Sequence, residues 1–266
     1  MDLSIHDLHF SYPTGVEALR GVSLAIRGGE RVAIIGQNGS GKTTLVKHLN
    51  GLLRPTRGEV SVGGWDTRTH TVAQLARRVG FLFQNPDEQI FKNVVAAEAA
   101  FGPRNLKLSE SEVQARVTAA LERAGLANVS GEHPYELLPS QRKWVAIASV
   151  LAMDPPVLVL DEPTTGQDAR GLARLGALVR DLAGEGRTVV MVSHDVDFCA
   201  EHFERVVVMM SGQVLADGPT RDILPQAELL AQTYVEPPQI TRLALELGLA
   251  TPITTVEEFL ASIRRE

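Results

Sequence analysis

The chain has 266 residues, of which 44% are hydrophobic and 22% charged, and its formal net charge is −6. This length allows one large or two small domains with a sizeable core, and the acidic balance argues against a nucleic-acid-binding surface over the whole chain. The single cysteine, Cys199, excludes an internal disulfide, fits a reducing compartment and is expected to be a small buried hydrophobe.

No segment is expected to cross a membrane. Residues 1–30 contain no signal segment, and the longest aliphatic runs have the length of strands, far short of the roughly 18 apolar residues of a membrane helix. The chain is therefore expected to be soluble by itself and to meet a membrane only through a partner.

Alternating apolar residues predict half-buried strands near the N-terminus, and Glu59–Val62 resembles them. The alternating positions are Leu3, Ile5, Val22, Leu24 and Ile26. These strands predict a small antiparallel layer. A buried strand, Val32–Ile35, lies between them in the chain.

A glycine-rich loop follows Val32–Ile35 and matches the spacing Gly-x-x-x-x-Gly-Lys-Thr of a phosphate-binding loop. Its glycines allow backbone N–H groups to surround phosphate oxygens, and a helix from about Thr43 to Leu49 would point its positive end at them. Lys42 is expected to reach the β- and γ-phosphates, and the Thr43 hydroxyl to ligate Mg²⁺. A chance match would not explain the strand before, the helix after and the Lys-Thr pair. The predicted loop contacts are Gly36, Gln37, Asn38, Gly39, Ser40, Gly41, Lys42, Thr43 and Thr44.

Residues 85–153 predict a helical insert in an α/β core. Ser109 and Glu112 form a capping box that opens a helix, and Gly125 ends it. A second helix is predicted at Arg142–Ala152. The apolar stripe of the first helix consists of Val113, Val117, Leu121 and Ala124.

Buried strands alternating with helices frame this insert, and they indicate a mostly parallel sheet covered on both faces. The predicted strands are Val79–Phe83, Val157–Leu160, Thr188–Val192 and Val206–Met210, with a helix at 169–183. After Gly218 the pattern is wholly helical, with one helix from Pro238 to Gly248 and a last one capped by Thr254–Glu257. The expected domains are 1–218 and a C-terminal extension, 219–266.

Polar residues end three of the buried strands, where the carboxyl ends of parallel strands line a ligand crevice. Asp161 is placed to hold Mg²⁺ beside Thr43, and Glu162 to orient or deprotonate the attacking water. A helix-capping acidic pair is the alternative. His194 is expected to contact the γ-phosphate, although a lone histidine is more often structural. Gln84 could sense the metal or the water.

Tyr12 lies before the loop, in Phe10–Pro13. Its ring could stack on a nucleotide base, but a core aromatic is the commoner role, and the sequence alone favours that role.

Over about residues 1–220 the chain resembles ATP-binding-cassette (ABC) ATPases, because five of its segments match the motifs of that family in order. These are the Walker A motif at Gly36–Thr44, the Q-loop at Gln84, the Walker B motif at Leu160–Pro163, the D-loop at Asp168 and the switch histidine at His194. The resemblance implies a P-loop core with antiparallel β and helical subdomains. It also implies ATP held between two such domains, where the phosphate loop of one faces a Leu-Ser-Gly-Gly-Gln signature of the other. Tyr12 then matches the adenine-stacking position.

A narrower resemblance is to energy-coupling-factor (ECF) importers of the cobalt and vitamin type. It rests on Gln84–Phe91, Ala100–Gly102, Phe10–Pro13 and the helical tail. It implies a peripheral ATPase on the cytoplasmic face of the membrane, a transmembrane T protein held at Gln84–Phe91, a substrate-binding S component, and a tail that pairs. Arginines of the T protein would meet Asp87 and Glu88, for which a solvated acidic turn is nearly as good an explanation.

Three other functions are weighed against this one. An ATPase of another ABC transporter class would share the motifs. A soluble ABC protein of DNA repair or translation usually has a second cassette or a long coiled coil, which this chain lacks. A nucleotide-binding module without turnover would not need Glu162 and His194.

The signature is degenerate, because Leu137–Gln141 reads Leu-Leu-Pro-Ser-Gln. Pro139 has no N–H, and Leu138 cannot contact oxygen, so a donor to phosphate is expected to be lost. We therefore expect an asymmetric ATPase heterodimer, in which the partner's loop works slowly. A homodimer, or a shifted Ser140 acting as the donor, is the alternative. The D-loop also departs from the family, since Gln167 stands where leucine is common.

Overall fold

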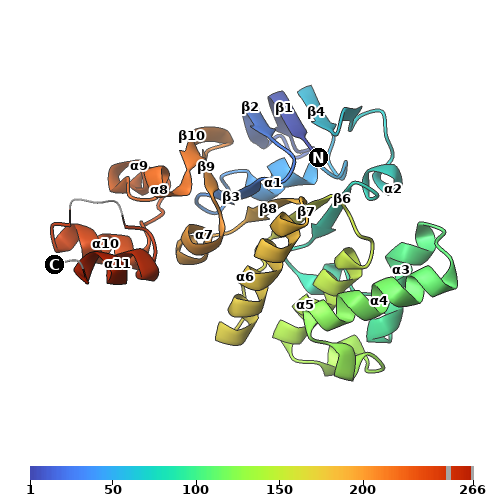
Figure 1. The fold of residues 1–266 in the computed structure, drawn as a ribbon. Coiled ribbons are helices and arrows are strands. Elements are labelled where there is room, and N and C mark those ends of the chain that lie inside the picture. The colour runs from blue at the N-terminus through green and yellow to red at the C-terminus, as the bar shows by residue number, and fades with distance from the viewer. Residues whose placement is uncertain (250–252, 265–266) are drawn as a thin grey trace.

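The computed structural model describes residues 1–249 and 253–264. Within these residues a six-stranded sheet and a four-stranded sheet lie beside a group of helices (Figure 1). The larger sheet has the strand order β10-β9-β3-β8-β7-β6, and the smaller has β2-β1-β4-β5. The predicted α/β class with a mostly parallel sheet is confirmed.

The larger sheet is built from short aliphatic strands that are buried almost throughout. Its parallel strands are β3 (Arg31–Ile35), β6 (Val79–Leu82), β7 (Val157–Asp161), β8 (Thr188–Val192) and β9 (Arg205–Met210). Successive residues of β3 enter two different hydrophobic clusters, Ala33 on one face and Val32 on the other. This two-sided burial explains why the strands read as continuous apolar runs.

The antiparallel edge strand β10 (Gln213–Pro219), beside β9, was not predicted. Most of its residues are exposed or half-buried, and it contains Gly218 and Pro219. An edge strand of this kind lacks the apolar alternation that identifies β1 and β2.

The predicted antiparallel layer is present. It consists of β1 (Leu3–Ser11), β2 (Glu17–Ile26), β4 (Arg57–Val62) and β5 (Trp65–Asp66). Its apolar side chains share one buried cluster with Leu45 and Val46 of α1 (Lys42–Lys47). The layer therefore packs directly against the helix that follows the phosphate loop.

The insert contains α3 (Val95–Asn105), α4 (Glu110–Ala124) and α5 (Pro139–Leu151), with the short α2 (Val72–Leu75) before it. The capping box of Ser109 and Glu112 and the C-cap at Gly125, with φ of 66°, are as predicted. Helix α5 begins at Pro139, earlier than the predicted Arg142, because proline suits the first turn of a helix.

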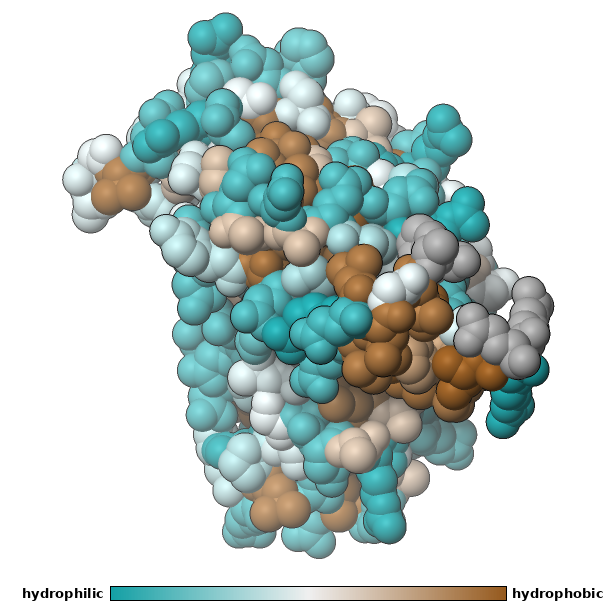
Figure 2. All heavy atoms as spheres, turned by 90° about the vertical axis from the view of Figure 1, so that its left-hand side faces the viewer, coloured by the Kyte–Doolittle hydropathy of each residue, from teal (hydrophilic) through white to brown (hydrophobic). Residues whose placement is uncertain are grey.

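The remaining helices are α6 (Ala169–Gly184), α7 (Val196–His202), α8 (Thr220–Ile223), α9 (Ala227–Ala231), α10 (Gln239–Glu246) and α11 (Val256–Ile263). Cys199 in α7 is fully buried, as predicted. The cap of α11 is corrected by one position, since Thr255 pairs with Glu258 rather than Thr254 with Glu257. Apolar side chains gather on the face near α10 and α11 (Figure 2). No described helix is both long and apolar enough to span a bilayer.

Candidate active site

The phosphate loop connects β3 to α1 with the backbone that the sequence predicts. Gly36 and Gly39 have φ of 144° and 79°. A Cβ atom at Gly36 would lie 2.2 Å from the carbonyl oxygen of Met209, so only glycine fits there. At Gly39 the surrounding space is open, and the positive φ alone favours glycine.

Lys42 is buried beneath this loop. Its Nζ donates to the carbonyl oxygens of Gly36 (2.7 Å) and Gln37 (3.0 Å). Burial lowers the pKa of Lys42, and the nearby carboxylates of Glu162 and Asp161 oppose that shift. The Ser40 hydroxyl is also buried and has no hydrogen-bond partner among the described residues. A desolvated lysine and an unused donor beside a glycine-rich loop fit a phosphate group.

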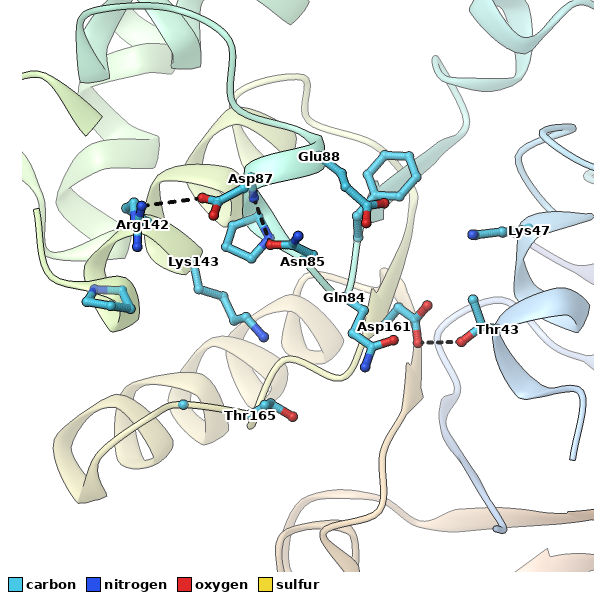
Figure 3. Close-up of a pocket in the computed structure, with 14 residues that line it drawn as sticks. Thr43, Lys47, Gln84, Asn85, Asp87, Glu88, Arg142, Lys143, Asp161 and Thr165 are labelled. Atoms are coloured by element: carbon cyan, nitrogen blue, oxygen red, sulfur yellow. Dashed lines mark hydrogen bonds and ion pairs between the residues drawn. The ribbon is translucent and has the colours of Figure 1, made fainter. Parts of the chain in front are cut away.

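Thr43 and Asp161 meet at the end of β7. The Thr43 hydroxyl donates to Oδ1 of Asp161 at 3.1 Å, as the close-up shows (Figure 3). Burial raises the pKa of Asp161, while the bond from Thr43 lowers it. Gln84 lines the same cavity of about 550 Å³ as this pair. A hydroxyl, a carboxylate and an amide are the oxygen ligands that suit Mg²⁺ bound together with phosphates.

Glu162 and His194 form a second pair of site residues, this time an acid and a base. Nδ1 of His194 lies 2.8 Å from Oε2 of Glu162. The Glu162 side chain is 7% exposed and that of His194 is 64% exposed. Glu162 has a left-handed backbone with φ of 50°, and its N–H donates to the carbonyl oxygen of Val192 at 2.9 Å. The carboxylate is thus aimed by a constrained main chain.

A cavity of about 650 Å³ brings these groups together with the loop. Its lining includes Gly36, Gln37, Asn38, Gln84, Glu162 and His194. Gln84 therefore lies on both cavities, between the Thr43–Asp161 side and the Glu162–His194 side. The residues predicted from the ends of separate strands are gathered at one edge of the sheet.

Tyr12 lies apart from the metal side of the site. Its hydroxyl is 2.9 Å from the Thr44 hydroxyl, and its ring meets Phe10 edge to face at 4.9 Å. The side chain is half-buried and packs against the core of the antiparallel layer. The structure thus attaches Tyr12 to the phosphate loop through Thr44.

The sequence reasoning missed Lys143. This side chain of α5 is 4% exposed, and its Nζ donates to the carbonyl oxygen of Glu162 at 2.8 Å. Burial lowers its pKa, opposed by the carboxylates of Glu162 and Asp161. The available signal was a lysine directly before the largely apolar run that starts at Trp144.

The signature segment, Leu137–Gln141, forms the start of α5. The Leu138 N–H donates to Oε1 of Gln141 at 3.1 Å, and Leu138 itself is 66% exposed. Pro139 occupies the first helical position. The segment thus presents an apolar side chain and a position without an N–H.

The phosphate loop between a strand and a helix, together with the acidic groups at the end of β7 in the same sheet, defines a P-loop ATPase with an appended β layer and helical subdomain. The chain belongs to the ABC transporter family, whose model matches residues 19–165. It is an ATP-binding ABC ATPase, for which hydrolysis drives transport.

Individual relatives agree with this assignment. The chain is 42% identical over 250 residues to the energy-coupling factor transporter ATP-binding protein EcfA of Methanothermobacter thermautotrophicus, covering 93% of this chain and 80% of that protein. The structure of CbiO1 from Clostridium perfringens, part of the ABC transporter complex CbiONQ, has a TM-score of 0.77 and 34% identity, covering 91% of this chain and 98% of that one. The cassette MJ0796, a dimer bound to ADP and phosphate, has a TM-score of 0.75 and 28% identity, covering 82% and 98%.

Proposed function

We propose that this chain is the ATPase of an ECF-type importer that takes up a vitamin or a transition-metal ion. A transmembrane T protein would hold it at the cytoplasmic face of the membrane, and an S component would bind the substrate. The observation that carries this proposal is the surface formed by Gln84–Phe91, beside the Thr43–Asp161 pair. The likeness to EcfA and CbiO1 supports it.

The surface at Gln84–Phe91 combines carboxylates with exposed aromatic rings. Asp87 and Glu88 line the cavity of about 550 Å³, and Asp87 lies 3.5 Å from Arg142 (Figure 3). Nearby, Phe91 and Phe101 meet edge to face at 4.7 Å and are 54% and 39% exposed. Exposed rings beside acidic groups suit an amphipathic helix that carries arginines. Gln84 would connect this surface to the nucleotide site.

Changing Asp87→Asn together with Glu88→Gln should weaken assembly with the T protein by about tenfold or more. Each charge-assisted pair contributes about 1.5–3 kcal/mol when a partner excludes water. Co-purification and titration with the T protein would measure the loss, and ATP binding should be unchanged. Arg142→Gln removes the internal ion pair and keeps both carboxylates, so an equal loss in that variant would contradict the proposed contact. Glu122→Gln with Asp181→Asn, two exposed positions on α4 and α6, is the matched control.

We propose the following roles within the site. The loop Gly36–Thr44 binds the phosphates, with Lys42 on the β- and γ-phosphates, and Tyr12 stacks on the adenine. Thr43, Asp161 and Gln84 would hold Mg²⁺, which neutralises phosphate charge when bound. Glu162 orients or deprotonates the attacking water, and His194 contacts the γ-phosphate.

Asp161→Asn should remove most of the effect of Mg²⁺ on ATP affinity, because the carboxylate charge that faces the cation is lost. Titration of the protein with a fluorescent ATP analogue, with Mg²⁺ and with EDTA, would measure this. Since burial raises the pKa of Asp161, the Mg²⁺ effect in the unchanged protein should fade on acidification at a higher pH than an exposed aspartate would give. An undiminished Mg²⁺ effect in Asp161→Asn would contradict the assignment.

The subunit arrangement that we propose is an asymmetric heterodimer with a second ABC ATPase. Its basis is the signature segment, in which Leu138 is exposed and Pro139 has no N–H to donate. Residues 1–218, with a helical subdomain at about 85–153, would form the ATPase domain, and 219–266 a separate extension. Purification from membranes should recover a second ATPase with an intact signature, a T protein and an S component. Recovery of a different kind of membrane partner would contradict the ECF proposal.

A further inference from the structure

Two departures from the family pattern, in the signature segment and in the D-loop, touch each other in the structure. The D-loop, Thr164–Asp168, lies between β7 and α6. Oε1 of Gln167 accepts a bond from the indole Nε1 of Trp144 at 2.9 Å, and its Nε2 donates to the carbonyl oxygen of Ser140 at 3.3 Å. Leucine, common at position 167 in the family, could form neither bond.

The orientation of the Gln167 amide is set by its surroundings. Trp144 is 3% exposed, and its indole N–H can only donate, so the amide oxygen must face it. The amide nitrogen is then directed at Ser140. The main-chain N–H of Gln167 donates to the carbonyl oxygen of Thr164 at 3.1 Å, which closes the D-loop turn. A Cβ atom at Gly171 would lie 2.3 Å from Oε1, so this glycine leaves room for the amide.

The start of the segment between β7 and α6 is also attached to helix α5. Lys143, next to Trp144, donates to the carbonyl oxygen of Glu162 at 2.8 Å. The segment from Glu162 to Gln167 is therefore attached at both ends to the first two turns of α5. One attachment holds the main chain of Glu162, the residue placed for hydrolysis, and the other holds the D-loop to the signature segment.

We propose that Gln167 is a positioning residue that locks the D-loop to the degenerate signature, so that a neighbouring ATPase subunit displacing the signature also displaces Glu162. This inference rests on the proposed pairing of two ATPase subunits. The lock gives the chain a direct connection between the signature segment, which would face the partner's ATP, and Glu162, which would act on the ATP at this chain's own phosphate loop. Gln167 acts through Ser140 and Glu162 and does not touch the nucleotide.

Three variants test this lock. Gln167→Leu removes both bonds and leaves the buried indole N–H unpaired. Trp144→Phe removes only the indole bond and keeps the bond to Ser140. The double variant, Gln167→Leu with Trp144→Phe, removes both the amide and the indole N–H and so leaves no unpaired buried donor. Its melting temperature should therefore recover toward that of the unchanged chain. Gln114→Leu, an exposed glutamine of α4, is the matched control.

In the isolated chain, hydrogen exchange of residues 162–168 should be at least tenfold faster in Gln167→Leu than in Gln114→Leu. In the assembled complex, kcat should fall at least fivefold in both Gln167→Leu and the double variant, with the KM for ATP within twofold and a smaller loss in Trp144→Phe.

Unchanged exchange in the isolated Gln167→Leu chain, or a double variant with full kcat, would overturn the lock. The second outcome would show that Gln167 serves stability alone. If a complex that contains the unsubstituted chain assembles but does not hydrolyse ATP, the proposed function is contradicted. Hydrogen exchange in the isolated Gln167→Leu chain would still decide whether the lock exists.

Discussion

Glu162→Gln is expected to lower ATP turnover at this chain's phosphate loop by about 10²–10⁴-fold, the usual contribution of a positioned acid–base group. Glutamine keeps the shape of the side chain but cannot accept a proton. The backbone around it should persist, because the N–H bond to Val192 and the bond from Lys143 both involve main-chain atoms of residue 162. ATP binding should remain, since Lys42 and the loop are unchanged.

Single-turnover hydrolysis and ATP binding by the purified complex would separate these two effects, with the exposed Glu122→Gln as the matched control. More than half of the normal turnover in Glu162→Gln would contradict the assigned role. The corresponding change in the partner ATPase tests the asymmetry. If both changes lower turnover of the complex equally, the two sites are equivalent and the heterodimer proposal loses its basis.

Restoring the family's signature sequence should produce the largest gain in ATP turnover. Leu138→Ser, Pro139→Gly and Ser140→Gly together should raise turnover at the partner's loop by about 10²–10³-fold, since one well-placed donor to a developing oxyanion contributes about 2.7–4 kcal/mol. The change supplies a hydroxyl and an N–H that the chain lacks. Leu138 is 66% exposed, so removing its side chain should cost little stability.

The measurement is cleanest in a chain that also carries Glu162→Gln, because only the partner's loop then turns over. Alanine at all three signature positions is the control, as it restores the N–H at position 139 without a hydroxyl or glycines. Equal turnover in the restored and unchanged chains, with a loss in the alanine control, would show that Ser140 already serves as the donor, and equal turnover in all three would contradict any role for a hydroxyl in this segment.

Much of the site could be predicted because it depends on local pattern. The order of strand, glycine loop and helix identifies Gly36–Thr44 from spacing alone. Asp161 and His194 were placed correctly because parallel strands end at the same edge of a sheet. Lys143 and the contact of Gln167 with Trp144 were missed, because they join segments whose proximity is set by how α5 packs on the sheet. Sequence periodicity carries no such information.

The left-handed backbone at Glu162 lowers the thermal stability of the chain at the same residue that we propose for catalysis. A side chain in this conformation costs about 1–2 kcal/mol relative to glycine, and the surrounding bonds hold it there. Glycine or asparagine at this position would relieve that cost and, given the role proposed for Glu162, yield a more heat-resistant chain with greatly lowered ATP turnover. Directed evolution for melting temperature alone would therefore drive this protein toward inactive variants, so any such selection should score turnover as well.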